Sequence, residues 1–99
     1  KETVGCGNTS GKKVDKFKSF RLTPVVASCV QAPLIKECYA NLECKVIDAT
    51  RANKYNLFIL KVVKAWIDPS IKHPRTLHHC GNGVFMIAGK TIKLASTKK

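Results

Sequence analysis

An alternation of apolar and polar side chains over residues 41–48 most constrains what this chain can fold into. Leu42, Cys44 and Val46 fall on one side of an extended segment, and Glu43 falls on the other. Because successive side chains of a β-strand point to opposite faces, this period of two predicts a half-buried strand. We expect its apolar side to face the core.

The next apolar run, residues 55–67, fits two periodicities. Several of its side chains, Ile59, Val63 and Trp66 among them, would line one face of a helix. β-Branched and aromatic residues dominate the run, however, and such residues favour strands, so we predict a second strand. The polar residues 50–54 between the two strands are typical of a hairpin connection.

Glycines mark the beginning of the chain. Residues 5–11 hold three glycines and small polar side chains, which predicts a loop. One short helix is expected to follow, with Ser10 as its N-cap and with Val14 and Phe17 on its apolar face.

Shorter segments complete the mainly β pattern. Residues 25–33 predict an extended connector, and residues 33–37 predict a single helical turn. Residues 78–83 are predicted to form a second glycine-rich loop. Residues 84–87 and 91–94 are expected to be extended.

The charge of the chain is strongly positive. Eighteen Lys and Arg residues against six Asp and Glu residues give a formal net charge of +12, which would suit a polyanion such as nucleic acid. The cations are scattered as singles and pairs, and only residues 12–21 and Lys98-Lys99 are concentrated. Because nucleic-acid-binding modules cluster their charge, a small basic nucleic-acid binder is a subordinate alternative.

Cysteines and apolar runs limit the class of protein. Five cysteines cannot all pair within one chain, and no Cys-x-x-Cys element is present, which favours a reducing cytoplasm. No apolar run approaches the roughly 20 residues of a membrane-spanning helix, so we expect no membrane partner. The length fits one domain over residues 1–99. His78, His79 and Cys80 are adjacent and seldom converge on one ion in such an arrangement, so no metal site is expected.

Residues 9–13, Thr-Ser-Gly-Lys-Lys, contain the parts of an anion cradle. Hydroxyl groups, two cations and a glycine that lets backbone amides converge precede an expected helix N-terminus, and a phosphate group would suit this chemistry. The segment is not a P-loop, because Cys6 stands at the first glycine position and Lys12 is followed by Lys13. A capped helix start with solvated lysines explains the same residues equally well.

The order and spacing of several segments resemble the flavin reductase-like family, especially its flavoredoxin branch. Ser-Gly-Lys-Lys-Val-Asp-Lys-Phe at residues 10–17 and Ala-Pro-Leu-Ile at residues 32–35 are the most specific of these segments. Asn-Leu-Glu-Cys-Lys-Val at residues 41–46 and the glycine-aromatic segment at residues 81–90 follow in the same order. The resemblance covers essentially the whole chain.

This resemblance implies a split β-barrel of the FMN-binding type, here an incomplete domain without the family's amino-terminal strands and with one short helix. It implies noncovalent FMN near the interface of a homodimer, and electron transfer from NAD(P)H or another donor. Because the flavin carries such chemistry, no catalytic acid or base is assigned. By resemblance, the cofactor-binding residues are Cys6, Gly7, Asn8, Thr9, Ser10, Gly11, Lys12, Lys13, Lys16 and Phe85.

An incomplete barrel exposes unpaired strand edges and apolar faces, which another chain must cover. We therefore expect a homodimer or a strand-exchanged oligomer. The main alternative function is a remnant that serves as an oligomerisation or interaction module without flavin.

Overall fold

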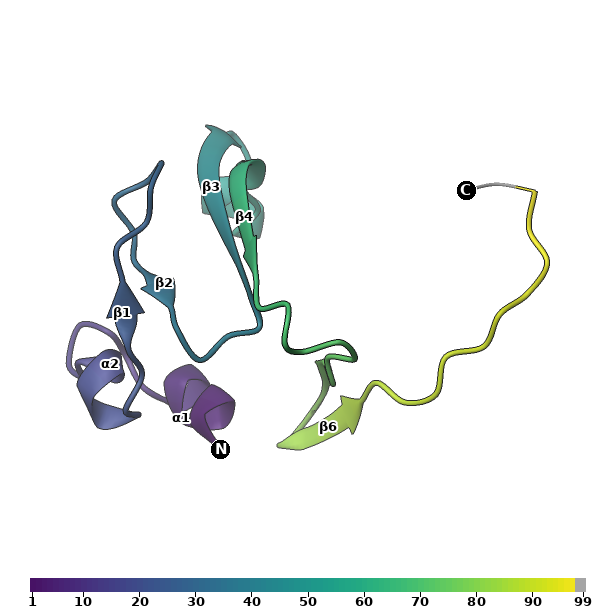
Figure 1. The fold of residues 1–99 in the computed structure, drawn as a ribbon. Helices are drawn as coiled ribbons and strands as arrows, with labels where there is room; N and C mark the ends of the chain where they lie inside the picture. Colours follow the sequence, from purple (N-terminus) through teal and green to yellow (C-terminus); the bar gives the residue numbers. More distant parts are fainter. Residues whose placement is uncertain (98–99) are drawn as a thin grey trace.

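The computed structural model describes residues 1–97, which form several short strands and few helices. The strands form three separate antiparallel pairs (Figure 1). The pairs are β1 (Pro24–Val25) with β2 (Leu34–Ile35), β3 (Ala40–Asp48) with β4 (Ile59–Ile67), and β5 (Leu77–Gly81) with β6 (Val84–Ile87). Within residues 1–97 no ladder joins one pair to another, so the described strands do not close a barrel.

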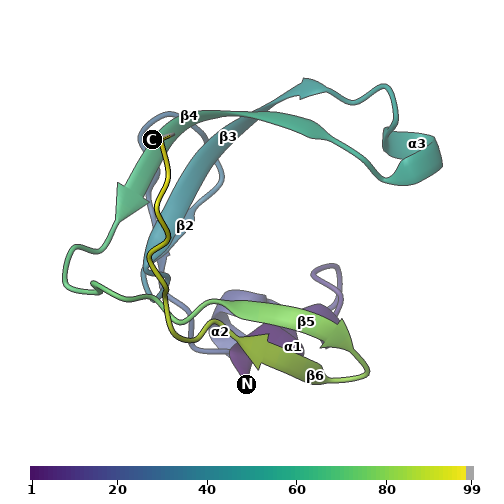
Figure 2. The same cartoon turned by 90° about the vertical axis from the view of Figure 1, so that its right-hand side faces the viewer.

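The β3–β4 hairpin is the longest element and confirms the predicted pair of strands. Its register runs from Ala40 opposite Ile67 to Asp48 opposite Ile59, with two irregularities along the way. Irregularities of this kind add a residue to one strand and bend the ladder. Figure 2 shows the hairpin as a long curved arm, with the β5–β6 hairpin lying across from it.

The connection between β3 and β4 is longer than the sequence pattern indicates. α3 (Ala52–Tyr55) forms one helical turn, and Asn56 follows it with a φ of 50°. An asparagine tolerates this left-handed conformation and ends the turn there. The second strand therefore begins at Ile59, and the prediction that it begins at Tyr55 is wrong.

The prediction of one short helix capped by Ser10 is also wrong. Besides α3, the described chain contains α1 (Glu2–Asn8) and α2 (Lys16–Ser19). Asp15 is the N-cap of α2, because its carboxylate accepts a hydrogen bond from the Lys18 N–H at 3.2 Å. No helix in the described part of the chain has the length and hydropathy that crossing a membrane requires.

Local contacts explain why the glycine-rich start of the chain is helical and not a loop. The Thr9 hydroxyl donates to the Gly5 carbonyl at 3.0 Å, and the Lys16 ammonium donates to the Cys6 carbonyl at 2.6 Å. These bonds satisfy carbonyl groups that a helix end leaves without partners. A Cβ atom on Gly5 would overlap the Phe20 ring, so the glycine allows α1 to approach the segment after α2.

The helical turn predicted at residues 33–37 is absent, because β2 pairs with β1 instead. The side-chain amide of Asn41 holds Ile35 in this extended form. Its Oδ1 accepts from the Ile35 N–H at 2.9 Å, and its Nδ2 donates to the Ile35 carbonyl at 3.0 Å. The Lys36 N–H donates to the Thr23 carbonyl at 3.0 Å and extends the pairing.

The loop predicted at residues 78–83 is mostly strand. Residues 78–81 belong to β5, and the turn into β6 consists of Asn82 and Gly83, with φ values of 50° and 75°. Two consecutive positive φ values are typical of a two-residue hairpin turn, which favours Asn-Gly. The extended segment predicted at residues 84–87 is confirmed as β6, whereas residues 91–94 lie in no strand of the described chain.

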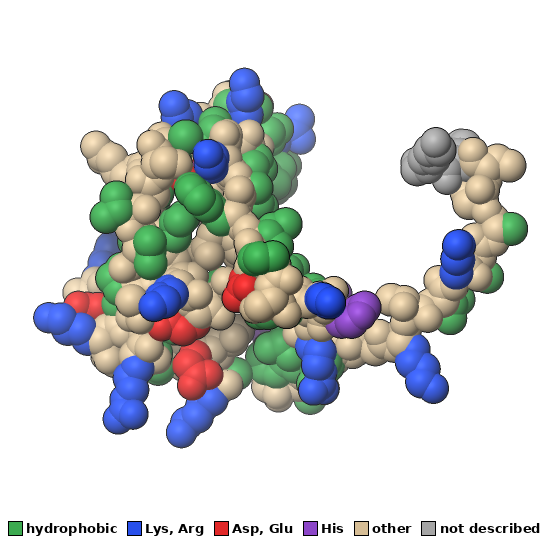
Figure 3. Space-filling view, viewed as in Figure 1, with side chains coloured by type: hydrophobic (Ala, Val, Ile, Leu, Met, Phe, Trp, Pro, Cys, Tyr) green, Lys and Arg blue, Asp and Glu red, His purple; other side chains and the backbone are tan. Residues whose placement is uncertain are grey.

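Burial in this structure is unusual. Within residues 1–97 no apolar side chain is fully buried, and Glu43, which is 1% exposed, is the most enclosed residue. The predicted orientation of β3 is therefore wrong, since Leu42 and Val46 are 59% and 57% exposed. The space-filling view shows hydrophobic side chains at the surface over much of one face (Figure 3).

Candidate functional site

Residues 10–16, here called the lysine loop, connect α1 to α2 through a tight turn. The Ser10 carbonyl accepts hydrogen bonds from the Lys13 and Val14 N–H groups at 3.0 Å each, and the Ser10 hydroxyl accepts one from the Lys12 N–H at 3.3 Å. Residues 11–17 line a hollow of about 560 Å³ on the surface of this turn. The lysine loop is thus a concave, basic surface.

The lysines of this loop have two different roles. Lys12 and Lys13 are exposed, and neither forms an ion pair within the described residues. Lys16 is half-buried, and its ammonium is held by the Cys6 carbonyl. Asp15, the acidic residue of the loop, caps α2 and lies 4.0 Å from the Lys18 ammonium. Two cations therefore remain available to an anionic ligand.

A second hollow, here called the ring hollow, lies between α1 and the β5–β6 hairpin. Its volume is about 360 Å³. Its lining residues are Thr3, Val4, Gly7, Asn8, His79, Gly83 and Phe85. His79 and Phe85 face each other across the hairpin and stack, with ring centroids 4.9 Å apart and ring planes 30° from parallel. The stacked pair gives this hollow an aromatic wall.

The structure divides the predicted site residues between the two hollows. Gly7, Asn8 and Phe85 line the ring hollow. The hollow at the lysine loop is lined by Gly11, Lys12, Lys13 and Lys16. Cys6, Thr9 and Ser10 hold the backbone of the connecting segment through the hydrogen bonds described above.

The sequence analysis missed His79 as a residue of this site. The signal was present in the Asn82-Gly83 dipeptide, which predicts a two-residue hairpin turn. Such a turn pairs the strands on either side of it, and a register shift between His79 and Gly81 then brings His79, in place of Cys80, opposite Phe85. Thr3, Val4 and Gly83 had no comparable signal.

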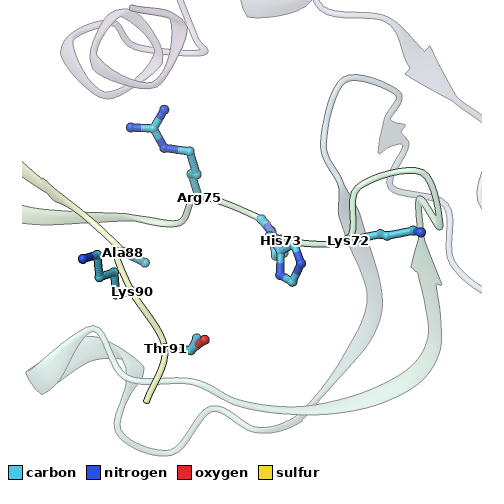
Figure 4. Close-up of a pocket in the computed structure, with 8 residues that line it drawn as sticks. Lys72, His73, Arg75, Ala88, Lys90 and Thr91 are labelled. Atoms are coloured by element: carbon cyan, nitrogen blue, oxygen red, sulfur yellow. The ribbon is translucent and has the colours of Figure 1, made fainter. Parts of the chain in front are cut away.

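A third hollow has a volume of about 720 Å³ and is lined by residues 72–75 and 88–91. It carries several basic side chains, but they do not converge. In Figure 4 Lys72, Arg75 and Lys90 point in different directions, away from a common centre. A polyanion or a phosphate group needs cations that point toward it, so we do not assign a site here.

Positive charge is also dispersed on the face of the molecule that Figure 3 draws. On the face drawn in Figure 3, Lys and Arg side chains project from several separate places and form no single patch. The charge on this face gives no support to the nucleic-acid-binding alternative. Within residues 1–97, no group of three or more His, Cys, Asp or Glu side chains is arranged to hold a metal ion.

Glu43 is the centre of a separate polar cluster, here called the Glu43 cluster. Its Oε2 accepts from the Trp66 indole N–H at 2.6 Å, and from the N–H and hydroxyl of Ser28 at 3.2 and 3.1 Å. Its Oε1 accepts from the N–H groups of Cys29 and Val30. The carboxylate therefore ties the loop at residues 28–30 to the β3–β4 hairpin.

Two opposing effects set the ionisation of Glu43. Burial alone would raise the pKa of its carboxyl group, but the hydrogen bonds from Trp66, Cys29 and Ser28 together outweigh burial and lower the pKa to about 2. The group is a carboxylate at neutral pH, and each of these hydrogen-bond partners is a donor. Its role is structural, because both of its oxygens are occupied within the protein.

Comparison with known proteins identifies the family. Residues 3–88 match the model of the flavin reductase like domain. This match covers most of the chain, so the chain belongs to the flavin reductase-like domain family, as the resemblance in the sequence predicted.

Individual relatives are longer than this chain. An uncharacterized protein of Escherichia coli (strain K12), YddH, is 31% identical over 102 residues, and an uncharacterized protein of Archaeoglobus fulgidus is 36% identical over 63 residues. These alignments cover 91% and 64% of this chain, but 54% and 36% of the two relatives.

A crystal structure of an FMN-binding domain of a flavin reductases-like enzyme from Shewanella baltica has a similar fold. Its TM-score is 0.75 at 24% identity, over 90% of this chain and 53% of that one. At this identity the likeness concerns the fold. The chain spans about half the length of this structure and of the Escherichia coli relative.

Proposed function

We propose that this chain binds FMN noncovalently and takes part in electron transfer through that flavin, from NAD(P)H or another donor. The bound flavin supplies the redox chemistry, and the protein supplies binding and orientation. Family membership over residues 3–88 supports this cofactor, as does the FMN-binding domain named for the Shewanella baltica structure.

The charge and shape of the lysine loop carry the proposal. Lys12 and Lys13 place two exposed cations on a concave turn next to the Ser10 hydroxyl. A phosphate monoester has about two negative charges at neutral pH and accepts charge-assisted hydrogen bonds from such groups. Lys16 keeps the loop against α1 through the Cys6 carbonyl and so positions the other two lysines.

Flavin retention tests the proposal. Purified protein is mixed with FMN and desalted, and the visible absorption of retained flavin is measured. We expect the wild-type chain to retain FMN and the double variant K12Q/K13Q to bind it at least about tenfold more weakly, because two charge-assisted contacts are lost. The matched control K45Q/K61Q removes two exposed lysines from the β3–β4 hairpin and should leave affinity unchanged. A wild-type chain that retains no flavin contradicts the proposal.

We also propose that a second copy of the chain covers the β3–β4 hairpin, in a homodimer or a strand-exchanged oligomer. The hairpin has exposed apolar side chains on both strands: Leu42, Val46, Ile47, Ile59, Leu60, Val62 and Ile67 are each half exposed or more. So many exposed apolar side chains on one hairpin favour an association surface. Sedimentation velocity at micromolar concentration tests this, and a monomer without larger species would contradict it.

One observation favours a second candidate function, an oligomerisation or interaction module without flavin. Within residues 1–97 no apolar side chain is fully buried and many are exposed, so association alone would give the chain a role. Flavin retention and sedimentation, measured on the same sample, separate the two candidate functions. An oligomer that retains no FMN supports the module, and an oligomer that retains FMN supports the flavoprotein.

A further inference from the structure

The stacked rings of His79 and Phe85 differ in how far they are exposed to solvent. Phe85 is half-buried and His79 is exposed, so the imidazole is the outer ring of the pair. Gly83, at the tip of the hairpin, and Gly7, across the hollow on α1, each have open space where a Cβ would be. An approaching ligand therefore meets little obstruction from the hairpin tip or from this part of α1.

We propose that the ring hollow takes the flat ring system of the flavin and that His79 is its stacking contact. This inference rests on the proposed function and adds to it a contact residue. It also assigns the two ends of the cofactor to two surfaces: the ring would bind at the β5–β6 hairpin and the phosphate at the lysine loop.

The chemistry of the lining favours a ring over a phosphate. No Lys, Arg, Asp or Glu lines the hollow, whose polar groups are the Asn8 amide, the Thr3 hydroxyl and the imidazole. An apolar and aromatic lining with a few hydrogen-bonding groups is typical of sites for planar ligands. Aromatic rings stack on one another in offset arrangements, and a third ring can extend the pair on its open side.

The position of the hollow relative to the lysine loop fits one extended ligand. α1 contributes Gly7 and Asn8 to the hollow and ends at Asn8, and the lysine loop begins two residues later. The bond from Lys16 to the Cys6 carbonyl fixes the loop against the same helix. A ligand with a planar ring at one end and a phosphate at the other can therefore use both surfaces along α1.

Two probes separate the two ends of the ligand. FMN has the ring and the phosphate, whereas riboflavin has the ring alone. Dissociation constants for both are measured from the quenching of flavin fluorescence in the full chain. We expect H79L to weaken FMN and riboflavin by the same factor, about 3- to 10-fold, and H79F to keep near wild-type affinity because it retains a flat ring.

Control variants make the assignment specific. H78A changes the neighbouring histidine, which does not line the hollow, and should change neither constant. K12Q/K13Q should weaken FMN and leave riboflavin unchanged, because riboflavin has no phosphate. Circular dichroism of H79L and H79F checks that both variants are folded, and both place a large apolar side chain at the same strand position.

The outcomes distinguish this inference from the proposed function. Wild-type protein that binds FMN, together with H79L and H79F variants that both bind like the wild type, overturns the ring assignment and leaves the proposed function standing. Equal weakening in H79L and H79F also overturns it, because a flat ring would then have no advantage. Wild-type protein that binds neither flavin overturns both proposals.

Discussion

The two ends of the β3–β4 hairpin are stabilised in different ways. At the end that holds Glu43 and Trp66, the carboxylate binds three backbone N–H groups, a hydroxyl and an indole. At the other end Val46 pairs with Leu60 across the strands, and these side chains are 57% and 51% exposed. One end is ordered by polar bonds within the chain, and the other has exposed apolar side chains. With the association proposed above, folding of the single chain and assembly of two chains would depend on different residues.

The largest expected effect comes from removing the centre of the Glu43 cluster. Glu43→Ala removes the acceptor shared by the donors of Ser28, Cys29, Val30 and Trp66, and hydrogen bonds to a charged group contribute more to stability than neutral ones. We expect the melting temperature to fall by at least about 10 °C. Hydrogen exchange of the residue 28–30 amides should rise to the rate of an open loop. Unchanged protection of these amides would show that the cluster does not hold the loop.

Substitution at the other end of the hairpin, near Val46 and Leu60, should affect folding less but should weaken assembly strongly. Leu60→Lys places a charge within the apolar pair with Val46, so we expect the dimer dissociation constant to rise at least about tenfold. Because Leu60 is half exposed, the free energy of unfolding of the monomer should change by less than about 1 kcal/mol. Analytical ultracentrifugation measures the first quantity and urea titration of dilute protein the second. Ile92→Lys, at an 80% exposed position outside the hairpin, is the matched control.

Acid should selectively destabilise the end of the β3–β4 hairpin that holds Glu43. The folded chain lowers the pKa of Glu43 from 4.5 to about 2, so its contribution to stability is complete above pH 4.5 and is lost as the pH falls toward 2. Urea midpoints measured between pH 7 and pH 3 should fall for the wild type. Glu43→Gln, which does not titrate, should start lower and have a shallower pH dependence. Identical slopes for the two proteins would assign the acid sensitivity to other carboxylates.

The smallest effect is expected for Asp48, a carboxylate at the other end of the same strand. Hydrogen bonds from the N–H and hydroxyl of Thr50 lower its pKa, but these bonds are exposed. Asp48→Asn should therefore lower the melting temperature by no more than about 3 °C, measured beside Glu43→Gln. A loss as large as that of the Glu43 variant would mean that burial does not separate the two groups.

Sequence periodicity predicted the strands of the long hairpin but reversed the faces of one of them. The alternation over residues 41–48 identified β3 correctly. It placed Glu43 toward solvent because a charge on an exposed face is the usual arrangement. Three successive N–H groups at residues 28–30 cover that face instead, and periodicity within one strand holds no information about a loop distant in sequence.

Hydrogen bonds between distant residues account for the other differences. Residues 33–37 have the local pattern of a helical turn, yet the Asn41 amide and the pairing with β1 hold Ile35 extended. Ser10 is a good N-cap by type, but it closes the turn of the lysine loop and Asp15 caps the helix. For the candidate site, the residue types of the lysine loop and Phe85 could be taken from sequence. Their division between two hollows depends on how α1 lies against the β5–β6 hairpin.

The indole of Trp66 makes this chain its own fluorescent reporter. Trp66 is the only tryptophan in the sequence, and its N–H donates to Glu43 at 2.6 Å. Opening of that bond should change the emission of a single, assigned fluorophore. The emission spectrum of tryptophan overlaps the absorption spectrum of oxidised flavins. Binding of FMN should therefore quench the Trp66 emission by energy transfer. One optical signal can thus follow both the integrity of the hairpin and the arrival of the cofactor, without any label.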